Sequence, residues 1–327
     1  MLEQDDIQHA LGELADGPLE DAALYNLSNL HGEALAVLAD AWPALPDERR
    51  QRIVARLVEI AEADFEADFS ELFKIALRDL DAHVRAAAIE GLWEVDDVIL
   101  VRPMVDILRR DSSILVREAA ASALSRFALL AELGRLPARL AQKVWDVLWE
   151  VIHDFEQDLS VRRRSIEALA YFDRPEVRRV IETAYADDEP KMRVSAVFAM
   201  GRSNDQDWSE IVLAELETDD PEMRYEAARA CGELRLAEAT GQLSRLVADV
   251  DPEVKMVAIW SLGQIATPEA RRVLEICYEQ GDEALHDAAD DALAEMDFLQ
   301  GDLDFSLYDF GGKEDDELLP WDEDEAD

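Results

Sequence analysis

Basic side chains are scarce in this sequence. Of its 327 residues, 32 are Lys or Arg and 75 are Asp or Glu, which gives a formal net charge of −43. A nucleic-acid-binding surface replaces the counterions around phosphate with Lys and Arg, and anionic membranes attract the same residues. The charge therefore predicts a protein partner that is itself basic, and it argues against nucleic acid and against a membrane.

Long apolar runs and cysteines are also few. No run approaches the roughly 18 apolar residues of a membrane span, and the first six residues lack the basic start and apolar core of a signal peptide. The two cysteines, Cys231 and Cys277, are too few for a disulfide framework. We therefore expect a cytoplasmic, soluble protein.

Glycine and proline are sparse for a protein made of strands. The chain has 13 Gly and 11 Pro, while 49% of its residues are apolar, so it is not a wholly disordered polyanion. Ala, Leu, Glu and Arg dominate, and these residues favour helices. The composition predicts an all-α fold.

The helical pattern repeats along the chain. An aliphatic residue, usually followed by Arg or Lys, recurs at 84, 116, 161, 192, 223, 254 and 285, at steps of 32, 45, 31, 31, 31 and 31 residues. Four equal steps are hard to obtain by chance. The spacing predicts an array of units of about 31 residues.

Each part of the repeat has a physical role. Three residues before most anchors stands an Asp or Ser that suits a helix N-cap, and Pro190, Pro221 and Pro252 follow at the first helical position. Small residues stand four and seven positions after the anchor, where they let a neighbouring helix approach closely. Gly201, Gly232 and Gly263 are expected to end their helices.

A second helix is expected before each cap. Its apolar positions include residues that lie eleven positions before their anchors, namely Phe73, Val105, Ile181, Val212, Leu243 and Leu274. Each unit is then a helical hairpin, which needs its neighbours to bury both faces.

The strings at 189–201, 220–232 and 251–263 share the pattern Asp/Glu-Pro-x-Val/Met-Arg/Lys-x-x-Ala. They resemble HEAT repeats, in particular the short HEAT-like repeats of the phycobilisome-lyase type, and the resemblance covers about 79–296. It implies a right-handed α-solenoid of stacked hairpins. Such repeats occur in scaffolds, chaperone-like adaptors, bilin lyases and DNA glycosylases.

The chain has three predicted parts. Residues 1–78 look like diverged capping repeats, 79–298 form the array with an enlarged unit around 126–158, and 299–327 form an acidic flexible tail. Pro137 is expected to open a long helix whose apolar side carries Val144, Trp145, Leu148, Val151, Ile152 and Phe155.

The tail combines charge with aromatic residues. Residues 301–327 hold twelve acidic residues and one base, so burial cannot offset the entropy of ordering them. Phe305, Tyr308, Phe310 and Trp321 interrupt this acidic stretch. They suggest a short motif that docks on a partner or on the solenoid; a plain solubility tail is the alternative.

No catalytic constellation stands out. The five histidines are scattered, no phosphate-binding glycine loop is present, and both cysteines align with buried repeat positions. We expect no catalytic residues, no metal and no cofactor.

A column of basic residues follows the anchors. We expect it to pair with cap carboxylates of the same or a neighbouring repeat, as a structural ladder of Asp81, Arg85, Arg117, Asp158, Arg162, Arg193, Asp220, Arg224, Asp251 and Lys255.

The positions two and six residues after the anchor are polar in the outer repeats, as with Glu118 and Ser122. In the three central repeats they are Val194, Phe198, Tyr225, Arg229, Met256 and Trp260. Aromatic residues, Met and Arg are enriched at binding hot spots. We interpret these six residues as a partner-binding stripe on the concave face; packing between repeats is the alternative.

The favoured function is a non-enzymatic scaffold or adaptor, a monomer that binds a basic or amphipathic protein segment along its concave face. The tail would add an accessory or autoinhibitory contact. Two alternatives stay open: a bilin-lyase-like enzyme or chaperone for chromophore attachment, and a nucleic-acid mimic that inhibits a DNA-binding protein.

Overall fold

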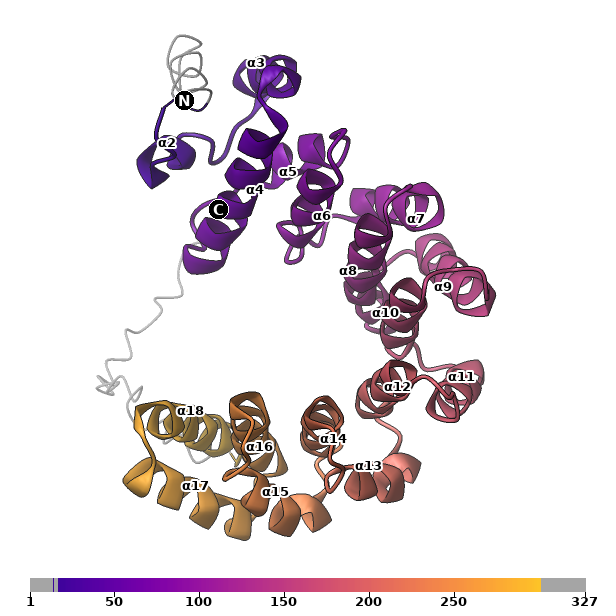
Figure 1. Ribbon diagram of the computed structural model, residues 1–327, viewed down its shortest axis with the longest axis vertical. Coiled ribbons are helices and arrows are strands. Elements are labelled where there is room, and N and C mark those ends of the chain that lie inside the picture. The colour runs from indigo at the N-terminus through magenta and orange to yellow at the C-terminus, as the bar shows by residue number, and fades with distance from the viewer. Residues whose placement is uncertain (1–13, 15–16, 301–327) are drawn as a thin grey trace, which may run out of the picture. The chain divides into compact units, whose positions relative to one another are not determined.

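The computed structural model describes residue 14 and residues 17–300 and divides into two compact units, Met1–Leu234 and Arg235–Asp327. Every regular element in the described residues is a helix (Figure 1). The predicted all-α solenoid of helical hairpins is confirmed. The aromatic residues of the tail and residues 1–13 lie outside the described residues.

The first unit begins with short helices and continues as hairpins. Its helices are α2 (Asp21–Tyr25), α3 (Gly32–Ala41), η1 (Trp42–Ala44), α4 (Asp47–Ala63), α5 (Ser70–Ala76), α6 (Ala82–Glu90), η2 (Val98–Leu100), α7 (Val101–Arg110), α8 (Ile114–Glu132), α9 (Ala138–His153), α10 (Leu159–Leu169), α11 (Pro175–Tyr185), α12 (Pro190–Arg202), η3 (Gln206–Trp208), α13 (Ser209–Glu215) and α14 (Pro221–Glu233).

The second unit holds two further hairpins. Its helices are η4 (Ala237–Ala239), α15 (Thr240–Leu246), α16 (Pro252–Ile265), α17 (Pro268–Gln280) and α18 (Glu283–Gln300). Helix α16 packs on α15, α17 and α18, as the hairpin pattern predicts.

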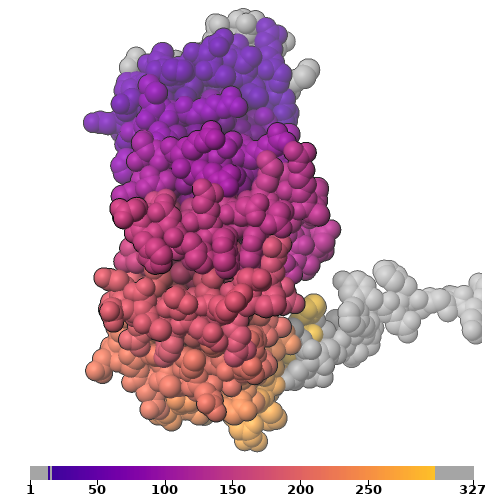
Figure 2. Space-filling model, turned by 90° about the vertical axis from the view of Figure 1, so that its right-hand side faces the viewer, coloured from indigo at the N-terminus to yellow at the C-terminus, as the bar shows by residue number. Residues whose placement is uncertain are grey.

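Within the first unit, the second helices of successive hairpins pack on one another in the order α4, α6, α8, α10, α12, α14. The first helices α7, α9 and α11 lie in the other row (Figure 1). Figure 2 looks onto that row, where successive repeats of the unit follow one another as bands of colour.

The predicted caps form at most repeats. The carboxylate of Asp81 accepts bonds from the N–H groups of His83 and Val84, and Asp158, Asp220 and Asp251 cap their helices in the same way. Pro190, Pro221 and Pro252 are the first residues of α12, α14 and α16. These helices therefore begin where the cap pattern places them.

The small residues four positions after each anchor are completely buried. Their exposed fraction is 0% at Ala88, Ala120, Ser165, Ala196, Ala227, Ala258 and Ala289. The first-helix positions are buried as well, with Phe73 and Ile181 at 1%. The core therefore runs along the contact between successive second helices.

The glycines do not end their helices, contrary to expectation. Helix α12 continues through Gly201 to Arg202, and α16 continues through Gly263 to Ile265. A Cβ at Gly201 would lie 2.8 Å from the Cα of Ala230 on α14. The glycine is therefore needed for close helix packing. The chain turns left-handed three residues later, at Asn204, Arg235 and Ala266, with φ between 52° and 54°.

The enlarged unit contains the expected long helix, α9, directly after Pro137. Val144, Trp145, Leu148, Val151 and Ile152 are buried on it. Phe155 is the exception, because the helix ends at His153 and leaves this ring 79% exposed.

A buried ion pair joins the first hairpins. Arg50 donates from Nε and Nη2 to the two oxygens of Asp79 at 2.7 and 2.9 Å, and Trp42 Nε1 donates to Asp79 at 2.7 Å. The side chains of Arg50 and Asp79 are only 4% and 2% exposed. Although burial alone would raise it, the bonds from Arg50, the Asp81 N–H and Trp42 hold the pKa of Asp79 below its ordinary value.

We expect Gly201→Ala to destabilise the first unit by about 1–3 kcal/mol, because α12 and α14 must move apart to admit the methyl group. Gly241→Ala is the control, since a Cβ there meets no atom within 4 Å. It should leave stability unchanged or raise it slightly. Urea denaturation followed by circular dichroism gives the free energy of unfolding of each variant. Equal destabilisation by the two substitutions would contradict the packing role of Gly201.

Asp79→Ala should cost about 3–5 kcal/mol, because it removes the buried partner of Arg50 and leaves it only the exposed carboxylate of Asp47. The control is Asp21→Ala, which breaks a similar two-bond pair with Arg56 whose side chains are 48% and 42% exposed. Thermal melts should separate the two variants clearly.

Because the folded pKa of Asp79 is lowered, the stability it contributes is present at neutral pH and is lost as the pH falls through that pKa.

Candidate interaction groove

The first unit carries a groove of about 1020 Å³ over α4, α6, α8 and the end of α10. Its floor is formed largely by half-buried alanines, including Ala86 and Ala87 of α6 and Ala119 and Ala123 of α8. Their side chains end at Cβ, so the space above the backbones stays open. We call this hollow the alanine groove.

Large apolar side chains stand at the edges of the alanine groove. Trp93, Leu115 and Leu129 line it and are 55%, 42% and 41% exposed. A contiguous exposed apolar surface of this kind is typical of binding sites. Tyr171, which follows α10, also lines the groove and is half-buried.

Arg126 holds the loop that carries Trp93. Its guanidinium donates to the carbonyls of Trp93 and Glu94 at 2.8 and 2.7 Å and to the carboxylate of Asp96. The loop between α6 and η2 is thereby fixed to α8. The backbone that carries the indole is therefore in place before any partner arrives.

Charged residues surround the apolar part of the groove. Glu90 is exposed, and Glu118 forms an ion pair with Arg164 at 3.4 Å. Arg164 also bonds Glu167, and Glu167 accepts a bond from Ser195 of α12 at 2.6 Å. The polar positions of these repeats therefore connect α8, α10 and α12.

The predicted partner-binding stripe is only partly on the surface. Val194 is 2% exposed and Arg229 is 8% exposed, so both belong to the packing between repeats and the prediction is wrong for them. Arg229 lies 4.0 Å above the ring of Phe198 and bonds Glu226 and Glu233. Burial raises the pKa of both carboxyls, although Arg229 opposes the rise.

The other stripe residues keep some exposed surface. Phe198 and Tyr225 are half-buried in the first unit. Met256 is half-buried and Trp260 is 37% exposed on α16 of the second unit. A contact between these four residues and a partner stays a prediction.

The basic column does not pair as expected at its first members. Arg85 bonds Asp111 at 2.7 Å and the Asp79 carbonyl at 2.8 Å, and Arg117 bonds the Asp111 carbonyl and Gln157. These partners are not the N-caps, whose carboxylates already accept backbone N–H groups. Arg85 and Arg117 each bond the carbonyl six residues back and reach the loop of the next repeat.

Comparison with known protein families identifies the repeat. Residues 209–294 match the family model of HEAT repeats. These residues are HEAT repeats. HEAT-repeat folds are typical of protein-interaction scaffolds. None of the curated proteins compared matches this chain.

Several solved structures resemble the chain at low sequence identity. Human deoxyhypusine hydroxylase in complex with glycerol is 17% identical over 86% of this chain and all of that one, with a TM-score of 0.37. The CpcE–CpcF complex of phycocyanin lyase from Nostoc sp. PCC7120 is 18% identical over 70% and 94%, with a TM-score of 0.46. At these TM-scores neither activity transfers to this chain.

Both cysteines of the chain are buried. Burial raises the pKa of the Cys231 thiol to about 12 and also raises that of Cys277, so neither is a thiolate at neutral pH. Among residues 14 and 17–300, no three His, Cys, Asp or Glu side chains could hold a metal ion together. The helices of this same part include none that is long and apolar enough to cross a membrane.

Sequence reasoning missed the alanine groove. Glu118 and Ser122 are polar and stand at the positions that carry apolar and aromatic residues in the central repeats. The overlooked signals are the adjacent alanines of α6 and α8 and the Trp93 that follows them. Arg50 was also missed as the first member of the basic column.

Phe198→Ala should lower the stability of the first unit by about 1–2 kcal/mol, because it removes the ring that the Arg229 guanidinium contacts. Trp260→Ala, at a more exposed position, should change stability less. Differential scanning fluorimetry compares the two. If Phe198→Ala leaves the stability unchanged, Phe198 belongs to a free surface instead.

Proposed function

We propose that the protein is a non-enzymatic interaction scaffold whose alanine groove binds an amphipathic, basic segment of a partner protein in the cytoplasm. The observation that carries the proposal is the open alanine floor beside the exposed side chains of Trp93, Leu115 and Leu129. An amphipathic helix buries its apolar face in a groove of this kind.

The shape of the groove favours a helix. Alanines from two parallel second helices form a shallow channel, and a helix brings its side chains down between them at the i, i+3, i+4 and i+7 positions. Trp93 and Leu115 stand where they contact the flanks of such a ligand. Because Arg126 already fixes the Trp93 loop, binding does not have to order it.

The charge of the protein favours a basic ligand. A net charge of −43 attracts cationic partners and raises their association rate, and salt weakens that attraction. The specificity would come from the groove itself, since rim charges change association rates more than affinity. Phe198, Tyr225, Met256 and Trp260 remain proposed secondary contacts, and the tail remains a proposed accessory or autoinhibitory one.

A fluorescein-labelled amphipathic helix of leucine and lysine tests the proposal by fluorescence anisotropy. Wild-type protein should bind it, and Leu115→Asp should weaken binding by at least about tenfold, because Leu115 lies at the groove edge. Leu80→Asp is the matched control, since Leu80 is a 94% exposed leucine that does not line the groove.

Two outcomes would overturn the groove as the binding site. One is equal loss of affinity in Leu115→Asp and Leu80→Asp, which would mean that the peptide responds to added charge alone. The other is tight binding of a scrambled peptide with the same composition, which would remove the need for an amphipathic helix.

A further inference from the structure

A second hollow lies apart from the alanine groove, where the enlarged repeat of the first unit meets the next repeat. It has a volume of about 360 Å³ between the end of α9, α10 and α11. Its apolar wall includes the buried side chains of Ile152, Ile166 and Val180. Trp149, His153 and Phe155 supply an aromatic side.

The aromatic side chains contact one another and neighbouring residues. Trp149 stacks on the buried Trp145, with ring centroids 5.5 Å apart, and His153 lies 4.2 Å from the Trp149 ring. Phe155 projects from the turn after α9, in which Asp154 accepts the N–H of Glu156. Arg162 lies 5.0 Å above the Phe155 ring. A phenylalanine that is 79% exposed therefore lies beside an apolar hollow, with a guanidinium group over its ring.

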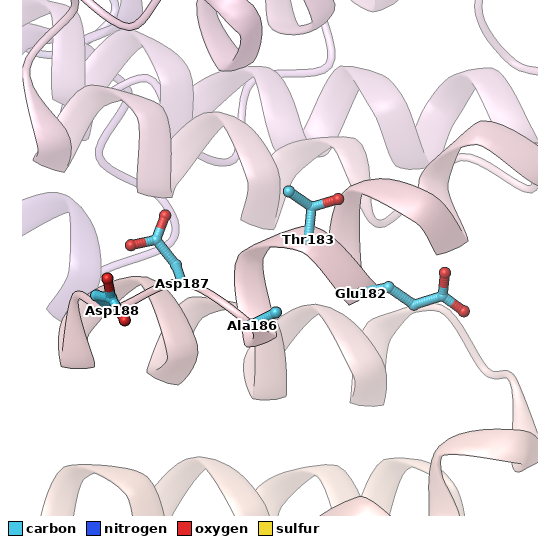
Figure 3. A pocket seen from close by; sticks show the side chains of 5 residues that line it. All are labelled: Glu182, Thr183, Ala186, Asp187 and Asp188. Carbon is cyan, nitrogen blue, oxygen red and sulfur yellow. The ribbon is translucent and has the colours of Figure 1, made fainter.

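An acidic depression adjoins this hollow. It has a volume of about 570 Å³ at the end of α11 and is lined by Glu182, Asp187 and Asp188. Thr183 and Asp187 line both hollows, so the two adjoin at these residues. Figure 3 shows Thr183 and Asp187 pointing to the same side of the chain.

The charge at one end of the combined hollows is negative. Four carboxylates line them, from Glu176, Glu182, Asp187 and Asp188, but Glu182 is paired with Arg178 at 3.2 Å, and the guanidinium groups of Arg162 and Arg179 line the apolar hollow. Arg162 is engaged with Phe155 and with the Ile152 carbonyl, and Arg179 faces Glu176 at 4.0 Å. Asp187 and Asp188 therefore leave a negative end next to an apolar one.

We propose that these two hollows form one docking site for a basic peptide segment with a single large apolar side chain. The apolar side chain enters between Phe155, Trp149 and Val180. A flanking lysine or arginine lies against Asp187 and Asp188. This site is independent of the alanine groove and accepts a short extended segment, because the apolar hollow is too small for a helix face.

The test uses a fluorescein-labelled nine-residue peptide with one central leucine flanked by lysines, measured by fluorescence anisotropy. Wild-type protein should bind it, and binding should weaken as NaCl is raised. Phe155→Ala should weaken binding by at least about tenfold. Asp188→Lys should have an effect of the same order.

The chain offers a matched control for each variant. Phe65→Ala removes another phenylalanine, 87% exposed, that lies outside both hollows. Asp219→Lys changes the residue that occupies the position of Asp188 one repeat later, 31 residues along the chain. Both controls should bind the peptide as the wild type does.

Three results would overturn the site. They are unchanged affinity in Phe155→Ala, equal affinity for the same peptide with glutamates in place of lysines, and no binding of the lysine peptide at all. Leu115→Asp separates this site from the alanine groove, because it should leave the short peptide's affinity unchanged. Loss in Leu115→Asp without loss in Phe155→Ala would place the peptide in the groove and refute the second site.

Discussion

The close approach of successive second helices is the contact on which the rest of each unit depends. It requires an alanine or serine four residues after every anchor, and all seven of these residues are fully buried. At Gly201 the approach is close enough that even a methyl group would collide with Ala230. A hairpin held this way cannot bury its faces alone, so the stability of each repeat depends on its neighbours.

This packing also explains much of the acidity. Short loops between closely packed hairpins leave backbone N–H groups without helical partners, and aspartates supply the acceptors. Asp79, Asp111, Asp187 and Asp249 each accept the N–H of the residue two positions later. Arginines in turn hold the carbonyls of the same loops. Part of the charge of −43 is therefore structural, and the remainder forms the field that a partner meets.

Local signals in the sequence were enough to predict the helices, the caps at residues such as Asp81, and the buried anchors. They failed where a neighbouring repeat decides the outcome. Val194 stands two residues from its anchor, on a nominally outer face, yet adjacent helices cover it. Gly201 looks like a helix end, but its role depends on Ala230, 29 residues away. The alanine groove likewise exists only because two helices, each unremarkable in sequence, lie side by side.

Arginine has a consistent role at both proposed surfaces. Arg126 fixes the backbone of the Trp93 loop, and Arg162 lies over the ring of Phe155, so each exposed aromatic residue has a neighbouring cation that is itself engaged. In a protein with few basic residues, this leaves the surroundings of each aromatic group dominated by carboxylates. A basic partner is then attracted by the field, while the aromatic ring selects its apolar side chain. Charge would govern the rate of encounter, and the aromatic side chains would govern which partner stays bound.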